Sequence, residues 1–276
     1  ARYAADGRGE EKVSGGAGVN KALLKFSEYP VSNEELAGLT EDQRAAFAVL
    51  CFAISELNFL SKMFRYSGHS DQEKDEIIAA WGIQSHILIR TISSKLFELR
   101  EFFKFTGNNN RTSDPYLEKL RKRANEKFRE IDKHEGLKLA KSIRHEASFH
   151  YRLGAAKKRL ASVHGDCIKS LYLHELGVNS FYPYGEEVLF IGLINEIAGS
   201  VEDKAKAKRV IEAWGEWSRQ SASAFNELLS EFVEELIVKR RPAKRPLEKM
   251  YWVEPSLVGE VEKTKLPAFV RIPKNV

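Results

Sequence analysis

The sequence predicts an all-α protein. Apolar residues recur at helical spacing through most of the 276 residues, and residues that favour helix caps precede the apolar stretches. Five of the eight prolines follow residue 240, so long helices are expected before that point and an irregular path after it. We therefore expect an antiparallel helical bundle with an additional C-terminal helical region and an irregular, proline-containing tail.

Two capping boxes predict where the first long helices begin. Thr40-Glu41-Asp42-Gln43 precedes an apolar pattern that predicts a helix over about residues 40–66, and Ser67-Gly68 ends it. Ser70-Asp71-Gln72-Glu73 has the same form before a second pattern that extends to about residue 105. Residues 106–115 are rich in turn-forming side chains, which predicts an exposed connection.

The remaining elements follow from the same patterns. A shorter helix is expected around residues 115–131, and another helix over about residues 134–163. Beyond Gly165 a short apolar piece, a turn-rich stretch and a second apolar segment precede a long amphipathic helix over about residues 200–238. Four expected segments result: a flexible glycine-rich leader (1–20), a helical bundle (21–165), an appended helical region that packs on the bundle (166–240) and an extended tail (241–276).

Composition limits the classes of function. The longest uninterrupted apolar run, Ala45 to Ile54, is shorter than the roughly 18 residues of a membrane span, so no transmembrane helix is expected. The two cysteines, Cys51 and Cys167, cannot build a disulfide framework or a Cys-x-x-Cys metal site, which favours a cytoplasmic location. Neither a glycine-rich phosphate loop nor a persuasive set of metal ligands occurs, so no cofactor and no metal are expected.

Basic residues are clustered although the formal net charge is only +5. The runs lie at residues 119–127, 157–159 and 239–245. Phosphate binding depends on local cation density, so these runs suit RNA as a partner. Charged runs are also common on ordinary solvated helix surfaces, and that alternative stays open.

The densest chemistry lies in the segment Ile143 to Tyr151, where Arg144 precedes His150 by six positions. A guanidinium can bind a phosphate with two parallel hydrogen bonds, and an imidazole can exchange a proton near neutral pH. Together they suffice for cleaving RNA without a metal. The pair His145-Glu146 followed by His150 is not a zinc-protease motif, because that motif needs its histidines four positions apart.

Helix geometry separates the two groups. Six residues advance about 600° around an ideal helix, which leaves Arg144 and His150 about 120° apart. A two-fold dimer that brings two such helices together is the simpler way to complete a site. A structural alternative also exists, in which His150 is a core or interface histidine beside Ile143 and Leu153 and Arg144 pairs with Glu146 or another carboxylate.

The segment resembles the Arg-x(4–6)-His signature of the HEPN superfamily. One group of bacterial HEPN-like proteins reads approximately Ile-Arg-Asn-x-x-Ala-Phe-His-Tyr, and this chain reads Ile143-Arg144-His145 and ends in Ser148-Phe149-His150-Tyr151. The resemblance covers about ten residues closely and the helical layout of residues 40–165 loosely. Two positions depart from the pattern: Glu146 adds a negative charge, and Ser148 replaces the usual alanine.

The HEPN superfamily includes toxins, phage-defence effectors and RNA-processing enzymes, so the resemblance implies a HEPN-like bundle and a metal-independent endoribonuclease that acts in stress or defence. It also implies a homodimer through the motif helix and admits an inhibitory partner protein. Arg144 and His150 are the expected catalytic residues, with His145 assisting. RNA is expected to contact four further residues, Tyr151, Lys157, Lys158 and Arg159.

A second function fits the same residues. A non-catalytic dimeric helical protein that binds RNA or a partner protein could use the basic runs without cutting the nucleic acid. RNA would then bind with a steep salt dependence and remain intact, since phosphate contacts release counterions whether or not a bond is broken.

Overall fold

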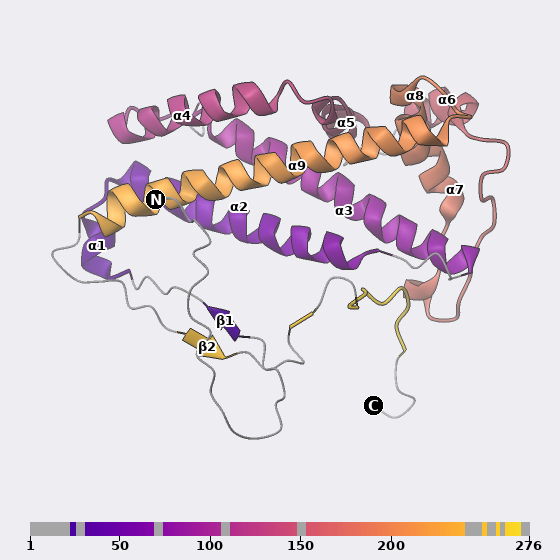
Figure 1. Cartoon of the computed structure of the whole chain (residues 1–276), viewed down its shortest axis with the longest axis horizontal. Helices are drawn as coiled ribbons and strands as arrows, with labels where there is room; N and C mark the ends of the chain where they lie inside the picture. The colour runs from indigo at the N-terminus through magenta and orange to yellow at the C-terminus, as the bar shows by residue number, and fades with distance from the viewer. Residues whose placement is uncertain are drawn as a thin grey trace, which may run out of the picture. The chain divides into compact units, whose positions relative to one another are not determined.

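A computed structural model of the chain describes residues 23–25, 31–68, 74–105, 111–147, 153–240, 250–252, 258–259 and 263–271. The chain forms two compact units, one from Ala1–Pro30 with Arg245–Glu260 and the other from Val31–Lys244 with Val261–Val276. Helices make up most of the described residues (Figure 1), which confirms the all-α prediction at the level of fold class.

The first unit contains a short pair of strands that no pattern in the sequence predicts. Strand β1 (Leu23–Lys25) pairs antiparallel with β2 (Met250–Trp252), and Leu24 lies opposite Tyr251. Segments from near the two ends of the chain therefore belong together. The predicted tail is accordingly not one segment, because residues 245–260 belong to the first unit and residues 261–276 to the second.

The second unit is built around four long helices, α2 (Glu41–Tyr66), α3 (Asp75–Phe102), α4 (Pro115–Ile131) and α9 (Lys204–Val233), with a π-helical segment η5 (Glu234–Val238) that continues α9. Figure 1 shows α9, in orange, running alongside the other three. The shorter elements are α1 (Asn33–Ala37), α5 (Gly136–Ser142), η1 (Ile143–Ala147), α6 (Leu153–Arg159), η2 (Leu160–Ser162), η3 (Gly177–Asn179), α7 (Pro183–Glu186), η4 (Glu187–Ile191) and α8 (Gly192–Ala198).

Local signals placed most long helices correctly, with two exceptions. Thr40 and Gln43 form the predicted capping box at the start of α2. Helix α3 instead begins at Asp75, after Lys74, and Ser70 lies outside the described residues. The single helix predicted over residues 134–163 is also wrong, because α5, the π-helical η1, α6 and the 3₁₀ turn η2 occupy the described parts of this range.

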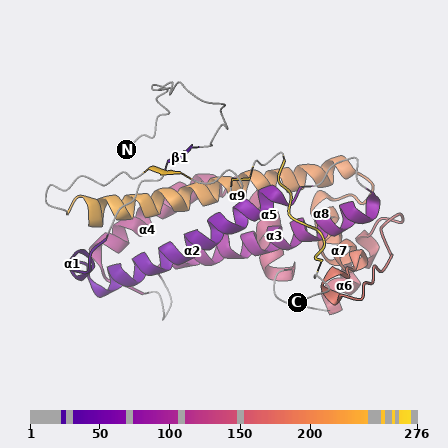
Figure 2. The same cartoon turned by 90° about the horizontal axis from the view of Figure 1, so that it is seen from below.

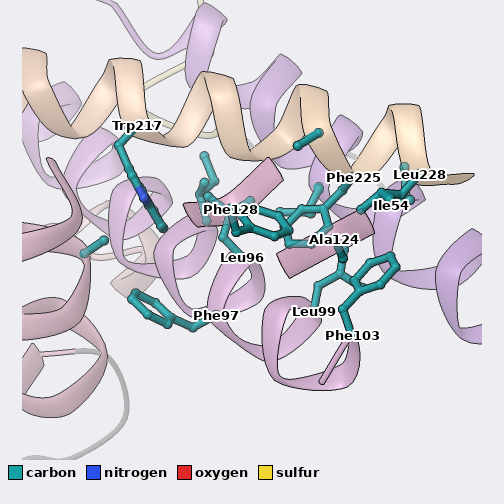
Figure 3. Packing of buried hydrophobic residues seen from close by; sticks show 14 of the residues in the cluster. Ile54, Leu96, Phe97, Leu99, Phe103, Ala124, Phe128, Trp217, Phe225 and Leu228 are labelled. Carbon is teal, nitrogen blue, oxygen red and sulfur yellow. The ribbon is translucent and has the colours of Figure 1, made fainter. Parts of the chain in front are cut away.

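Helix α9 lies at the centre of the core and is not an appended element. Its Trp214, Phe225 and Leu228 are almost completely buried in one cluster with residues of α2, α3 and α4. Figure 3 shows Trp217 and Phe225 of α9 directed at Phe97 and Phe128. The structure therefore does not divide the chain at residue 165, since the bundle before that residue has no complete core without α9.

Helix α2 is long and apolar enough to cross a membrane by length and composition, alone among the helices of the described residues. No such helix is expected from uninterrupted apolar runs, because the polar residues Ser55 and Glu56 interrupt the apolar sequence of α2. In the structure Leu50, Ile54 and Leu57 place one side of α2 in the core. Figure 2 shows α2 beside α9 along most of its length.

Asp114 joins the starts of α2 and α4. One carboxylate oxygen accepts hydrogen bonds from the backbone of Tyr116 and Leu117, at 2.9 and 3.0 Å, and caps α4. The other accepts from Thr40 Oγ1 at 3.0 Å and Gln43 Nε2 at 2.9 Å. Asp114 is only 7% exposed, so this end of the predicted exposed connection is in fact buried.

Replacing Asp114 by alanine should lower the free energy of unfolding at pH 7 by about 2 kcal/mol, because a helix cap is lost and the Gln43 amide loses its partner. Burial raises the pKa of Asp114, but the hydrogen bonds outweigh it and the net pKa is lowered. The ionised carboxylate thus stabilises the protein above the usual aspartate pKa of about 4, and this stabilisation is lost as the pH falls through the lowered value.

Urea unfolding of the wild type and Asp114→Ala as a function of pH tests this. The difference between the two proteins should narrow in acid. Asp166→Ala is the matched control, because that side chain is 94% exposed and should change stability little at any pH. A difference that stays constant down to pH 2 would contradict the role of the charge.

Candidate functional site

Gly136 sets the position of the motif segment. A Cβ atom at this residue would lie 2.1 Å from the carbonyl oxygen of Ala213 and 2.7 Å from Cα of Trp214, so only glycine permits this approach of α5 to α9. Leu139 and Ala140 then bury the next turn of α5 in the core. The motif follows directly and is therefore attached to a closely packed support.

The motif itself begins in a π-helical segment. Ile143 is completely buried, and η1 packs against α3 and α5. Such π-helical turns are rare and often occur at functional sites, because the wider turn changes which side chains share a face. A continuous α-helical register through Arg144 therefore does not hold in this protein.

Arg144 lies on the ring of Phe97. The guanidinium carbon is 5.6 Å from the ring centroid, and Phe97 in turn stacks on Trp217 at 5.7 Å. Within the described residues Arg144 forms no ion pair. An aromatic face orients a guanidinium while its N–H groups stay available at the edges, so the full charge of Arg144 can serve a ligand.

Glu146 forms an ion pair with Arg159 and not with Arg144. Arg159 Nη2 donates to the Glu146 carboxylate, Nη1 lies 3.5 Å from the carbonyl oxygen of Leu189, and Nε lies 3.5 Å from Glu196. The Arg159 side chain is completely buried. The negative charge that seemed unfavourable beside Arg144 is thus compensated by a buried cation.

The three basic residues predicted to contact RNA have different environments. Arg159 is completely buried, so its assignment to substrate binding is wrong. Its guanidinium pairs with Glu146 of η1 and Glu196 of α8. Lys158 is exposed but forms an ion pair with Glu196. Lys157 is exposed and forms no ion pair within the described part of the chain. Among these three residues, only Lys157 is both exposed and without an ion pair to another described residue, and phosphate binding needs both properties.

The histidines of the motif are only partly described. His145 is exposed, as a residue that contacts substrate requires. The predicted catalytic His150 and the predicted RNA contact Tyr151 lie outside the described residues. The assignments of both residues stay predictions.

Basic residues of α4 form ion pairs with other helices of the protein. Arg123 Nη1 lies 3.0 Å from Glu231 and 2.9 Å from Glu235, and Lys127 Nζ lies 2.7 Å from Glu227. These carboxylates belong to α9 and η5. The run at residues 119–127 therefore joins two helices, and its cations are largely compensated.

A second polar cluster was not recognised in the sequence. Arg90 forms two hydrogen bonds with Glu186, at 2.6 and 2.9 Å, and His86 Nδ1 lies 3.4 Å from the same carboxylate. Burial raises the pKa of Glu186, but hydrogen bonds from His86 and Arg90 outweigh it and lower the net value. Phe190 packs against both basic side chains. His86 and Arg90 share one side of α3 at i, i+4 spacing, but nothing in the sequence identifies Glu186 as their partner.

The chain matches no protein-family model, no curated protein and no solved structure.

Proposed function

We propose that the protein is a metal-independent endoribonuclease of HEPN type, with Arg144 and His150 as its catalytic residues. The observation that carries the proposal is the environment of Arg144, which is oriented by Phe97 and forms no ion pair within the described residues. An arginine with a purely structural role is usually paired with a carboxylate or a carbonyl group. An oriented, uncompensated arginine suits an anionic substrate.

The reaction follows from the two side chains. His150 removes the proton of a ribose 2′-hydroxyl, and the 2′-oxygen attacks the adjacent phosphorus atom. The bond from phosphorus to the 5′-oxygen breaks, and the leaving 5′-oxygen takes up a proton from water, while His150 returns its proton to the solvent. Arg144 stabilises the negative charge on the phosphate in the transition state. The products are a 2′,3′-cyclic phosphate and a 5′-hydroxyl.

The surroundings of Arg144 favour an anion in two ways. The pairing of Glu146 with Arg159 removes the repulsion that a free carboxylate would exert on a phosphate. His145 and Lys157 are exposed polar residues near the motif in sequence, and they are the candidates for contacts to the RNA strand. Arg159 has a positioning role only.

Cleavage of total RNA in EDTA, with analysis of the product ends, tests the proposal. The wild type should produce cyclic phosphate ends, and the Arg144→Ala/His150→Ala double variant should be slower by at least about 100-fold, the usual contribution of a general base. Arg219→Ala is the matched control, because this arginine is 66% exposed and lies far from the motif in sequence.

Two results would contradict the proposal. The first is equal cleavage by the wild type and the folded double variant, which would mean that Arg144 and His150 do not catalyse the reaction. The second is RNA that binds to the wild type and stays intact, with binding that weakens steeply as salt is added. That second result would favour the non-catalytic RNA-binding protein.

A further inference from the structure

The outer side of α2 carries apolar residues that the described structure leaves exposed. Phe52 is 68% exposed, Phe59 54% and Val49 42%. Ala45 and Ala48 on the same side are exposed too. Only 17% of the most apolar stretch of α2 is buried. Contiguous apolar surface of this kind marks an interaction site, whereas scattered single residues do not.

The spacing of these residues indicates a helical partner. Ala45, Phe52 and Phe59 follow one another at intervals of seven residues. Side chains seven residues apart stay close to one line along a helix, so these three residues form a narrow apolar line along which a second helix can pack lengthwise. A helix lying on a membrane surface needs a broad apolar face but no such repeat.

The line of residues is complementary to itself in the reverse direction. We propose that α2 packs antiparallel against α2 of a second copy of this chain, with the two-fold axis at Phe52. Ala45 and Phe59 are each seven residues from Phe52, about 10 Å along the helix. Each Ala45 would therefore face Phe59 of the second copy, so that a small side chain meets a large one, and the two interfaces would be identical.

Charges at the ends of α2 support the same arrangement. Glu41 and Lys62 are eleven and ten residues from Phe52 on opposite sides, so the axis places Glu41 of one copy level with Lys62 of the other. Neither residue forms an ion pair with another described residue, and Lys62 Nζ lies over the Phe59 ring at 5.4 Å. A parallel pair would instead bring like charges together.

This interface differs from the dimer through the motif helix that the sequence suggested. The motif segment η1 packs on α3 and α5, whereas the proposed interface is the side of α2 that faces away from the core. Each copy would then carry its own Arg144, outside the interface. The dimer does not depend on the proposed ribonuclease activity and is tested separately from it.

Sedimentation equilibrium of the full chain over the micromolar range tests the proposal. The wild type should be a dimer, and Phe52→Glu should raise the dissociation constant by at least about 30-fold, the effect of removing a central apolar anchor. Phe59→Glu should act in the same direction. Both side chains are exposed in the protomer, so circular dichroism should show the wild-type helix content. Leu173→Glu is the matched control, because Leu173 is 76% exposed and lies outside α2.

Exchanging the charges of Glu41 and Lys62 tests whether the two α2 helices of the dimer run antiparallel. Glu41→Lys and Lys62→Glu should each weaken the dimer a few-fold, and the double variant should restore the wild-type dissociation constant. A monomeric wild type overturns the proposal; if that monomer binds phosphatidylserine vesicles and Phe52→Glu does not, the exposed side of α2 is a membrane surface. A dimer unaffected by Phe52→Glu but dissociated by changes in the motif overturns it as well.

Discussion

Replacing Gly136 by alanine should destabilise the protein by more than about 3 kcal/mol, the upper part of the range for overpacked sites. The new methyl group would overlap the backbone of α9, with the Ala213 carbonyl oxygen only 2.1 Å away. Backbone atoms cannot rotate aside as a flexible side chain can, so α5 and α9 would have to separate. Trp214 lies at the contact and packs against Phe64, so the separation would disturb the core directly.

Urea unfolding followed by tryptophan fluorescence and by circular dichroism measures this effect. Gly215→Ala is the matched control, because this glycine lies within α9 and an added Cβ meets no atom within 4 Å. The control should be neutral or should stabilise the protein by about 0.5–1 kcal/mol, the gain expected when alanine replaces glycine in a helix. Equal stability of Gly136→Ala and the wild type would show that α5 and α9 do not approach this closely.

Replacing Arg159 by alanine should lower the free energy of unfolding by about 3 kcal/mol. The side chain is completely buried, so its removal leaves a cavity and separates Glu146 from its partner. The electrostatic part of the loss is limited, since Glu146 is 39% exposed and can turn toward water. Arg159→Met keeps most of the packing and should cost about half as much.

Thermal and urea unfolding of both variants tests this prediction, with Lys157→Ala as the matched control. Lys157 is two positions away and exposed, and its replacement should change stability by no more than about 0.5 kcal/mol. Similar losses for Arg159→Ala and Lys157→Ala would mean that Arg159 is not buried between η1 and α8. In the assay of the proposed ribonuclease activity, Arg159→Ala should also cleave RNA more slowly, because the freed Glu146 carboxylate would repel phosphate.

Much of the helical layout could be predicted from neighbouring residues. The capping box at Thr40 and the pair Asp114-Pro115 fix the starts of α2 and α4, because a cap satisfies backbone N–H groups within one turn of itself. Helix α9 shows its amphipathic spacing over eight turns. The start of α3 was predicted at Ser70 but lies at Asp75, and Ser70 is outside the described residues.

Other features depend on residues that are far apart in the chain. Arg144 and Phe97 belong to different elements, and no local pattern indicates that the arginine would lie on that ring. Lys157, Lys158 and Arg159 are consecutive and chemically similar, yet one is exposed, one is paired at the surface and one is completely buried. Their difference arises from the packing of α6 against α8 and η4, which the local sequence does not encode.

The sequence by itself determined that the chain is mainly helical and where most long helices begin and end. These properties follow from hydrogen bonding and apolar spacing within a few turns. Only the tertiary structure decided that α9 completes the core, that Gly136 lets α5 pack directly on α9, and that Arg159 compensates Glu146. Those outcomes are set by close packing and by ion pairs between segments distant in sequence, where burial decides which charges remain available.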